Sequence, residues 1–173
     1  MSRKILVGGV AMAMALLATL GAGLVGANGH AAQAQVGKAA PELSVTELHD
    51  QSPITLATLR GRPAVVNFFS TWCEGCRAEH QALQQAARSS VDRPRFVGIA
   101  EDEDPQAVQR FLEEHGTAYP VAVDPQSSAA SAWGVAGLPH TFFLDARGVV
   151  VASHTGPLDD RTLAELLKSL IGG

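Results

Sequence analysis

The chain has two cysteines, Cys73 and Cys76, and only two residues separate them. They follow the apolar run 64–69 and precede a stretch of good helix formers, so the pair is predicted to lie at the start of a helix. Free backbone N–H groups and the positive end of the helix dipole stabilise a thiolate there. Because the thiolate is the nucleophile of thiol–disulfide exchange, we expect Cys73 to attack a disulfide and the more covered Cys76 to resolve the mixed disulfide.

Other uses of this cysteine pair are weaker predictions. A structural disulfide that closes so short a loop constrains the unfolded chain little. A tetrahedral zinc site needs four ligands, and the chain has no second Cys-x-x-Cys. A copper or zinc site that combines the cysteines with His80 or His140 stays open as an alternative, although either histidine is also an ordinary surface or packing residue.

Glu74, between the cysteines, bears on the direction of electron flow. A carboxylate beside the Cys73 thiolate offsets part of the stabilisation that the helix provides. A less stabilised thiolate corresponds to a more reducing couple, so the sequence predicts a reductant. If Glu74 points into solvent, its charge is screened and this effect is lost.

The N-terminus reads as an export segment. Arg3 and Lys4 precede an uncharged stretch over residues 5–25, which is typical of a signal peptide. Small residues at 32–34 favour cleavage before Gln35, but the apolar stretch is also about as long as the roughly 20 residues of a membrane span. We therefore predict that residues 1–34 are a signal peptide or an N-terminal membrane anchor, and that either delivers residues 35–173 outside the cytoplasm as one domain.

Composition and charge limit the class of partner. The chain is 46% hydrophobic and 17% charged, as expected of a globular protein. Removing residues 1–34 takes away two basic residues and no acidic one, so the net charge of −4 becomes −6. Nucleic acid is an unexpected partner for such an acidic domain.

Short apolar runs alternate with helical patterns after the leader, which predicts an α/β domain with a mixed sheet and helices on both faces. The expected strands cover 43–48, 54–56, 64–69, 95–100, 121–123, 141–144 and 149–153. The expected helices cover 73–88, 105–115 and 127–132, with a last one from about 159. In helix 105–115 an apolar stripe is expected at Val108, Phe111, Leu112 and His115. In the last helix, a second apolar stripe that packs into the core is expected at Leu163, Leu166, Leu167 and Leu170.

Two segments together resemble a known family. Residues 67–80 read Asn-Phe-Phe-Ser-Thr-Trp-Cys-Glu-Gly-Cys-Arg-Ala-Glu-His, and residues 137–142 read Gly-Leu-Pro-His-Thr-Phe. From about Val36 to its C-terminus the chain resembles the TlpA/ResA/CcmG (DsbE) branch of the thioredoxin superfamily. The resemblance implies a thioredoxin-like fold, a central mixed sheet flanked by helices on both faces with an N-terminal β extension, and an extracytoplasmic thiol–disulfide oxidoreductase.

The resemblance also assigns site residues. It implies a cis Pro139 that faces the cysteine pair and, with Leu138 and Trp72, binds an extended substrate by strand addition. Glu79 matches an acid that the family buries beneath the cysteines, where it relays a proton to or from the resolving thiol. A solvated glutamate on the helix face is the alternative for Glu79. Asn67 stands where thioredoxin carries a buried aspartate, and it cannot titrate.

Partners follow from the resemblance in the same way. It implies a protein disulfide substrate, namely apocytochrome c before haem attachment, and a membrane thiol donor of the CcdA/DsbD type. No cofactor is expected beyond the redox-active Cys73–Cys76 disulfide. The alternatives are an oxidase or isomerase that forms disulfides in exported proteins, and a copper-binding metallochaperone. Gly75 departs from the family, since relatives often carry proline there, and this loosens the start of the helix.

Overall fold

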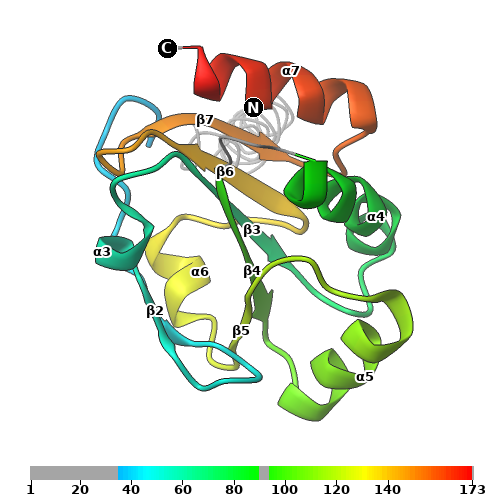
Figure 1. The fold of residues 1–173 in the computed structure, drawn as a ribbon. Helices are drawn as coiled ribbons and strands as arrows, with labels where there is room; N and C mark the ends of the chain where they lie inside the picture. Colours follow the sequence, from blue (N-terminus) through cyan, green and yellow to red (C-terminus); the bar gives the residue numbers. More distant parts are fainter. Residues whose placement is uncertain (1–34, 90–93, 173) are drawn as a thin grey trace, which may run out of the picture.

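A five-stranded mixed sheet forms the centre of the computed structural model, which describes residues 35–89 and 94–172 (Figure 1). The strand order is β5-β4-β3-β6-β7, in which β3, β4 and β5 are parallel and β6 and β7 are antiparallel to their neighbours. The strands are β1 (Ser44–Thr46), β2 (Pro53–Thr55), β3 (Ala64–Phe69), β4 (Arg95–Glu101), β5 (Val121–Asp124), β6 (His140–Leu144) and β7 (Val150–Thr155). The helices are α3 (Leu56–Leu59), α4 (Glu74–Ser89), α5 (Pro105–His115), α6 (Ser128–Ala132) and α7 (Asp160–Ile171).

Helices cover both faces of the sheet, as the sequence predicts. Every residue of β3 is buried, and its side chains alternate between the two faces. On one face Val65 packs with apolar residues of α4 and α7, and Phe69 packs with residues of α5. On the other face Phe68 packs with Trp133 beside α6 and with residues of α3. In Figure 1, α3 and α6 lie to the left of the sheet and α4 and α5 to the right.

Local sequence signals explain where the elements begin and end. The Asp104 side chain accepts the Gln106 N–H at 3.2 Å, Pro105 occupies the first turn of α5, and Gly116 ends that helix with φ of 80°. Asp145 closes the β6–β7 hairpin by accepting the N–H groups of Arg147 and Val149, both at 2.9 Å. These caps place α5 and the hairpin where the sequence predicts them.

The N-terminal β extension is a two-stranded antiparallel sheet. β1 pairs with β2, and the Leu48 N–H donates to the Val121 carbonyl at 2.8 Å, which joins the extension to the edge strand β5. The prediction of a strand through Leu56 is wrong, because Thr55 caps a short helix in a reciprocal capping box with Thr58. Leu56 is the first residue of that helix, α3.

Two further expectations are tested by burial. The stripe on α5 buries Val108, Phe111 and Leu112, but the His115 side chain is 39% exposed, so the predicted stripe is one residue too long. The apolar stripe of α7 packs into the core through Leu163 and Leu170. The export segment over residues 1–34 lies outside the described residues. Within the described ranges, no helix is long and apolar enough to cross a membrane.

Candidate redox-active site

The two cysteines form a disulfide at the N-terminus of α4. Their Cα atoms are 5.2 Å apart, and the Cys76 N–H donates to the Cys73 Sγ at 3.2 Å. This N–H is one of the donors that the first turn of a helix leaves without a backbone partner. Cys73 is 9% exposed and Cys76 3%, so Cys76 is the more covered sulfur, as expected. Next to them, Trp72 is 70% exposed.

Cys73 opens into a groove of about 510 Å³ that runs between the start of α4 and the segment before β6. The groove is lined by Trp72, Cys73, Glu74, Glu101, Asp102, Ser127, Val135, Ala136, Gly137 and Leu138. Three of these side chains are carboxylates and none is basic. Burial raises the pKa of Glu101, and the nearby carboxylates of Asp124 and Asp102 raise it further. The groove that Cys73 lines therefore carries acidic side chains and no basic one.

The Leu138–Pro139 peptide bond is cis, and it lies against the cysteine loop. A Cβ at position 75 would lie 3.3 Å from the Cδ of Pro139, so the glycine lets this proline approach the residues between the cysteines. Pro139 is buried and Leu138 is half-buried at the wall of the groove. The absence of a side chain at Gly75 thus leaves room for Pro139 and Pro157 beside the turn between the cysteines.

Glu79 lies one turn beyond Cys76 on the same face of α4, and it is only 1% exposed. Its Oε1 accepts the Asn67 Nδ2–H at 2.8 Å, and its Oε2 accepts the Leu158 N–H at 2.8 Å. Burial raises the pKa of Glu79 to about 7, and the two donors oppose that rise. The side chain is a buried acid that titrates near neutral pH, not a solvated residue on the helix face.

Asn67 connects the buried acid to the strand that follows Pro139. Its Nδ2 group donates to Thr141 Oγ1 at 2.9 Å as well as to Glu79. The carboxylate is therefore held by Asn67 on the central strand β3 and by the segment after β7, and Asn67 is itself bonded to Thr141 on β6. An aspartate at position 67 would add a second acid beside Glu79, which the amide avoids.

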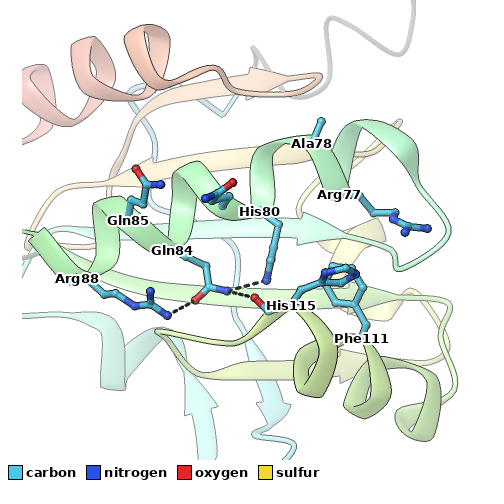
Figure 2. A pocket seen from close by; sticks show the side chains of 9 residues that line it. Arg77, Ala78, His80, Gln84, Gln85, Arg88, Phe111 and His115 are labelled. Carbon is cyan, nitrogen blue, oxygen red and sulfur yellow. Dashed lines mark hydrogen bonds between the residues drawn. The ribbon is translucent and has the colours of Figure 1, made fainter.

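The two candidate metal-binding histidines are buried packing residues on different elements. His80 lines a groove of about 570 Å³ between α4 and α5, beside Gln84 and Phe111 (Figure 2). Its Nε2 lies 3.0 Å from the Gly116 carbonyl oxygen and 2.9 Å from Gln84 Nε2. Burial lowers the pKa of His80. His140 stacks on Phe142 at 4.3 Å, on the face of the sheet opposite Thr141 and Glu79.

Burial also lowers the pKa of His140, to about 4. Its Nδ1 is buried and has no hydrogen-bond partner. Over residues 35–89 and 94–172, no group of three or more His, Cys, Asp or Glu side chains is placed to hold a metal ion. The copper or zinc alternative therefore has no ligand cluster in the described structure.

The sequence of the predicted domain matches a known protein family. The model of the Redoxin family matches residues 35–170, nearly the whole predicted domain. The chain belongs to the Redoxin family. Among curated members, the thiol:disulfide interchange protein HelX of Rhodobacter capsulatus is 33% identical over 163 residues, which cover 88% of this chain and 91% of HelX. The thiol:disulfide interchange protein DsbE of Allochromatium vinosum is 35% identical over 139 residues, 79% of this chain and 75% of that protein.

A solved structure of another thiol:disulfide interchange protein has the same fold as this Redoxin-family chain. The thiol:disulfide interchange protein of the thioredoxin family from Chlorobium tepidum TLS superposes with a TM-score of 0.69 at 31% identity, covering 78% of this chain and 96% of that one. These findings confirm the predicted thioredoxin-like fold and the resemblance to the TlpA/ResA/CcmG (DsbE) branch. The Redoxin-family protein is a thiol–disulfide oxidoreductase.

Sequence reasoning missed several residues that shape the site of this Redoxin-family protein. Glu101 and Asp102 line the groove, and Glu103 accepts both the N–H and the hydroxyl of Thr71, at 2.6 and 2.7 Å, which fixes the turn before Trp72. The sequence feature that could have revealed these residues is the acidic run 101–104 at the end of a buried parallel strand, because binding sites often lie at the carboxyl ends of such strands. The segment Gly156–Leu158, which holds Glu79, gives no comparable signal.

Proposed function

We propose that this protein is an extracytoplasmic disulfide reductase that acts on proteins by mixed-disulfide exchange. The observation that carries the proposal is the Cys73–Cys76 disulfide, whose outer sulfur opens into a groove lined with carboxylates. The names of the HelX and DsbE relatives, thiol:disulfide interchange proteins, support the exchange chemistry. No cofactor is required beyond the two cysteines.

In the proposed reaction, the reduced protein attacks with the Cys73 thiolate. That thiolate forms a bond to one sulfur of the substrate disulfide, whose S–S bond breaks and releases one substrate thiolate. Cys76 then loses its proton to the Glu79 carboxylate and attacks the Cys73 sulfur, which releases the second substrate thiolate. The two substrate thiolates then take up two protons, one that Glu79 gives up and one from solvent. The substrate thus gains two electrons and two protons, Glu79 returns to its carboxylate form, and Cys73–Cys76 becomes a disulfide. A membrane thiol donor of the CcdA/DsbD type returns the two electrons.

The charge of the groove supports the direction of this reaction. The helix N-terminus and the Cys76 N–H stabilise a Cys73 thiolate, whereas Glu74, Glu101 and Asp102 destabilise it. Glu74 is exposed, so its own contribution is reduced by solvent. A thiolate opposed by carboxylates lowers the stability of the reduced form and makes the couple more reducing.

The same groove supports a class of substrate. Trp72 and Leu138 offer an apolar surface beside Cys73 for an extended segment, next to the buried Pro139. The carboxylates favour a segment that carries lysine or arginine near its cysteine. Apocytochrome c before haem attachment is the proposed substrate, and residues 1–34 are proposed to export the domain or to anchor it through residues 5–25.

The redox potential of the purified protein tests the direction. Equilibration with glutathione buffers should give a potential near that of thioredoxin, about −270 mV, and far below the roughly −120 mV of a strong dithiol oxidase. Neutralising two groove carboxylates, as Glu101→Gln with Asp102→Asn, should raise the potential by on the order of 20 mV. Glu114→Gln, on exposed α5 surface, should leave it unchanged. A potential near that of the oxidase would support the oxidase alternative.

A further inference from the structure

The connection between β7 and α7 touches three parts of the redox site with three consecutive residues. The Gly156 N–H donates to the Pro139 carbonyl at 2.8 Å. The Pro157 ring packs on the turn between the cysteines, where a Cβ at Gly75 would lie 3.5 Å from the Pro157 Cδ. The Leu158 N–H donates to the Glu79 carboxylate at 2.8 Å. The buried acid and the proline beside the cysteines are thus held by one short segment.

We infer that the segment Gly156–Leu158 is a positioning element that couples the ionisation of Glu79 to the placement of Pro139. The inference deepens the proposed function, because both residues belong to the proposed exchange site. The two hydrogen bonds of the segment are donated by the backbone N–H groups of Gly156 and Leu158. They therefore depend on the path of the chain and not on the side chain of residue 158.

The coupling has a direct physical basis. A hydrogen bond to an ionised carboxylate is roughly twice as strong as one to a neutral carboxyl group. Protonation of Glu79 therefore weakens its hold on the Leu158 N–H. Pro157 lies between the two donating amides, and its ring fixes φ, so the segment is stiff. A change at Leu158 then reaches the Gly156 N–H and the Pro139 carbonyl that accepts it.

Few other titratable groups bear on this contact. Burial, and then the charge of Glu79, raise the pKa of Tyr119, so its phenol stays neutral across the working range. Asp159 follows Leu158, but hydrogen bonds from the Thr162 side chain and from the Thr162 N–H, the latter at 2.7 Å, lower the pKa of its carboxyl group at the start of α7. The Cys73–Cys76 pair does not titrate while it is oxidised. His154 lies two residues before Gly156 on β7, opposite Thr141 in the strand register, and its charge acts on Asp159 and His140. Because Glu79→Gln keeps His154, a response of the Gly156 amide that disappears in that variant reports on Glu79.

The test removes the Leu158 N–H from the full oxidised chain by replacing Leu158 with its α-hydroxy acid analogue, which keeps the side chain. The matched control makes the same replacement at Leu163, whose N–H donates to the Asp159 carbonyl at 2.9 Å. Both leucines are 2% exposed, so the two variants differ in which acceptor loses its donor. Carbon NMR of the Glu79 carboxyl group follows its titration.

The inference predicts that the Leu158 replacement raises the midpoint of the Glu79 titration by about one pH unit, because a donor to the ionised form is lost. The Leu163 replacement should leave that midpoint unchanged. In the unmodified chain the Gly156 amide proton should titrate with the Glu79 midpoint, and Glu79→Gln should abolish this response.

Equal midpoints of the Glu79 titration in the two backbone variants would overturn the inference. A Gly156 amide proton whose chemical shift does not change as Glu79 ionises would also overturn it. The amide comparison between the wild type and Glu79→Gln requires no backbone replacement, so it decides the coupling even if the modified chains fail to fold. Neither measurement requires turnover. A protein that fails as a reductase but shows the shifted midpoint would refute the proposed function and leave this inference standing.

Discussion

The buried Glu79 makes the stability of the oxidised protein depend on pH, and Glu79→Gln isolates that dependence. Burial raises the pKa of this carboxyl from an ordinary 4.5 to about 7 in the folded protein. The native state therefore keeps the proton to higher pH than the unfolded chain does. Stability from this group is complete below pH 4.5 and is lost as the pH rises through 7. One pKa unit corresponds to about 1.4 kcal/mol, so the loss is about 3 kcal/mol.

Urea unfolding of the oxidised chain at a series of pH values from 4 to 8.5 measures this loss. The difference between wild type and Glu79→Gln cancels the titration of groups common to both proteins, including the buried His80 and His140. The Gln variant should gain about 3 kcal/mol relative to wild type between pH 4.5 and pH 8. Glu114→Gln removes a carboxylate whose side chain is 73% exposed, and should differ from wild type by less than about 0.5 kcal/mol throughout.

A constant difference between wild type and Glu79→Gln across this range would refute the reasoning. It would mean that Asn67 and Leu158 stabilise the ionised carboxylate as well as water does, so that burial leaves no net effect on the pKa. Glu79 would then be ionised at every pH at which exchange occurs, and it would be unable to hold a proton for Cys76 at neutral pH.

Two further predictions concern residues around the cysteine loop. His140 is buried with a pKa of about 4 against an ordinary 6.5, so its contribution to stability is present above pH 6.5 and is lost as the pH falls through 4. Urea unfolding at pH 7 and pH 4 measures this loss, and His140→Phe should reduce the difference in free energy of unfolding between the two pH values by about 3 kcal/mol. An unchanged difference would contradict the burial of His140 as a neutral ring. Gly75→Ala would place a Cβ 3.3 Å from the Pro139 Cδ, so we expect a several-fold increase in KM for a protein disulfide. The free energy of unfolding of Gly75→Ala, measured by denaturation, should differ from that of wild type by about 1 kcal/mol or less. An unaltered KM would mean that Pro139 moves to accommodate the added Cβ without effect on substrate binding.

Local patterns in the sequence predict the sheet and the helix that bears the cysteines. β3 is one continuous β-branched and aromatic run, and α5 is bounded by Asp104, Pro105 and Gly116, so the predicted ends agree with the structure. The short helix α3 was missed because its capping box is built from two threonines, and its four residues offer no periodic pattern.

The residues alone predict the cysteine pair, and the family resemblance adds the distant Pro139, whereas the contacts that the fold makes through backbone groups are missed. Spacing along α4 leaves a solvated position open for Glu79, and the resemblance is what predicts its burial beneath the cysteines. The Leu158 amide contacts Glu79 from 79 positions away, and a backbone donor carries no residue signature. The i, i+7 spacing predicts His115 on the apolar stripe of α5, but spacing alone does not reveal that this side chain, in the last turn of the helix, is 39% exposed.

The central claim is that Cys73 attacks a protein disulfide and Cys76 resolves the product. The most direct measurement incubates two single-cysteine variants of the full chain, Cys76→Ser and Cys73→Ser, with a protein disulfide and counts mixed disulfides by mass spectrometry. Cys76→Ser should accumulate the mixed disulfide through Cys73, which opens into the groove, whereas Cys73→Ser should form little because Cys76 is 3% exposed. Equal trapping by both variants, or none by Cys76→Ser, would contradict the account.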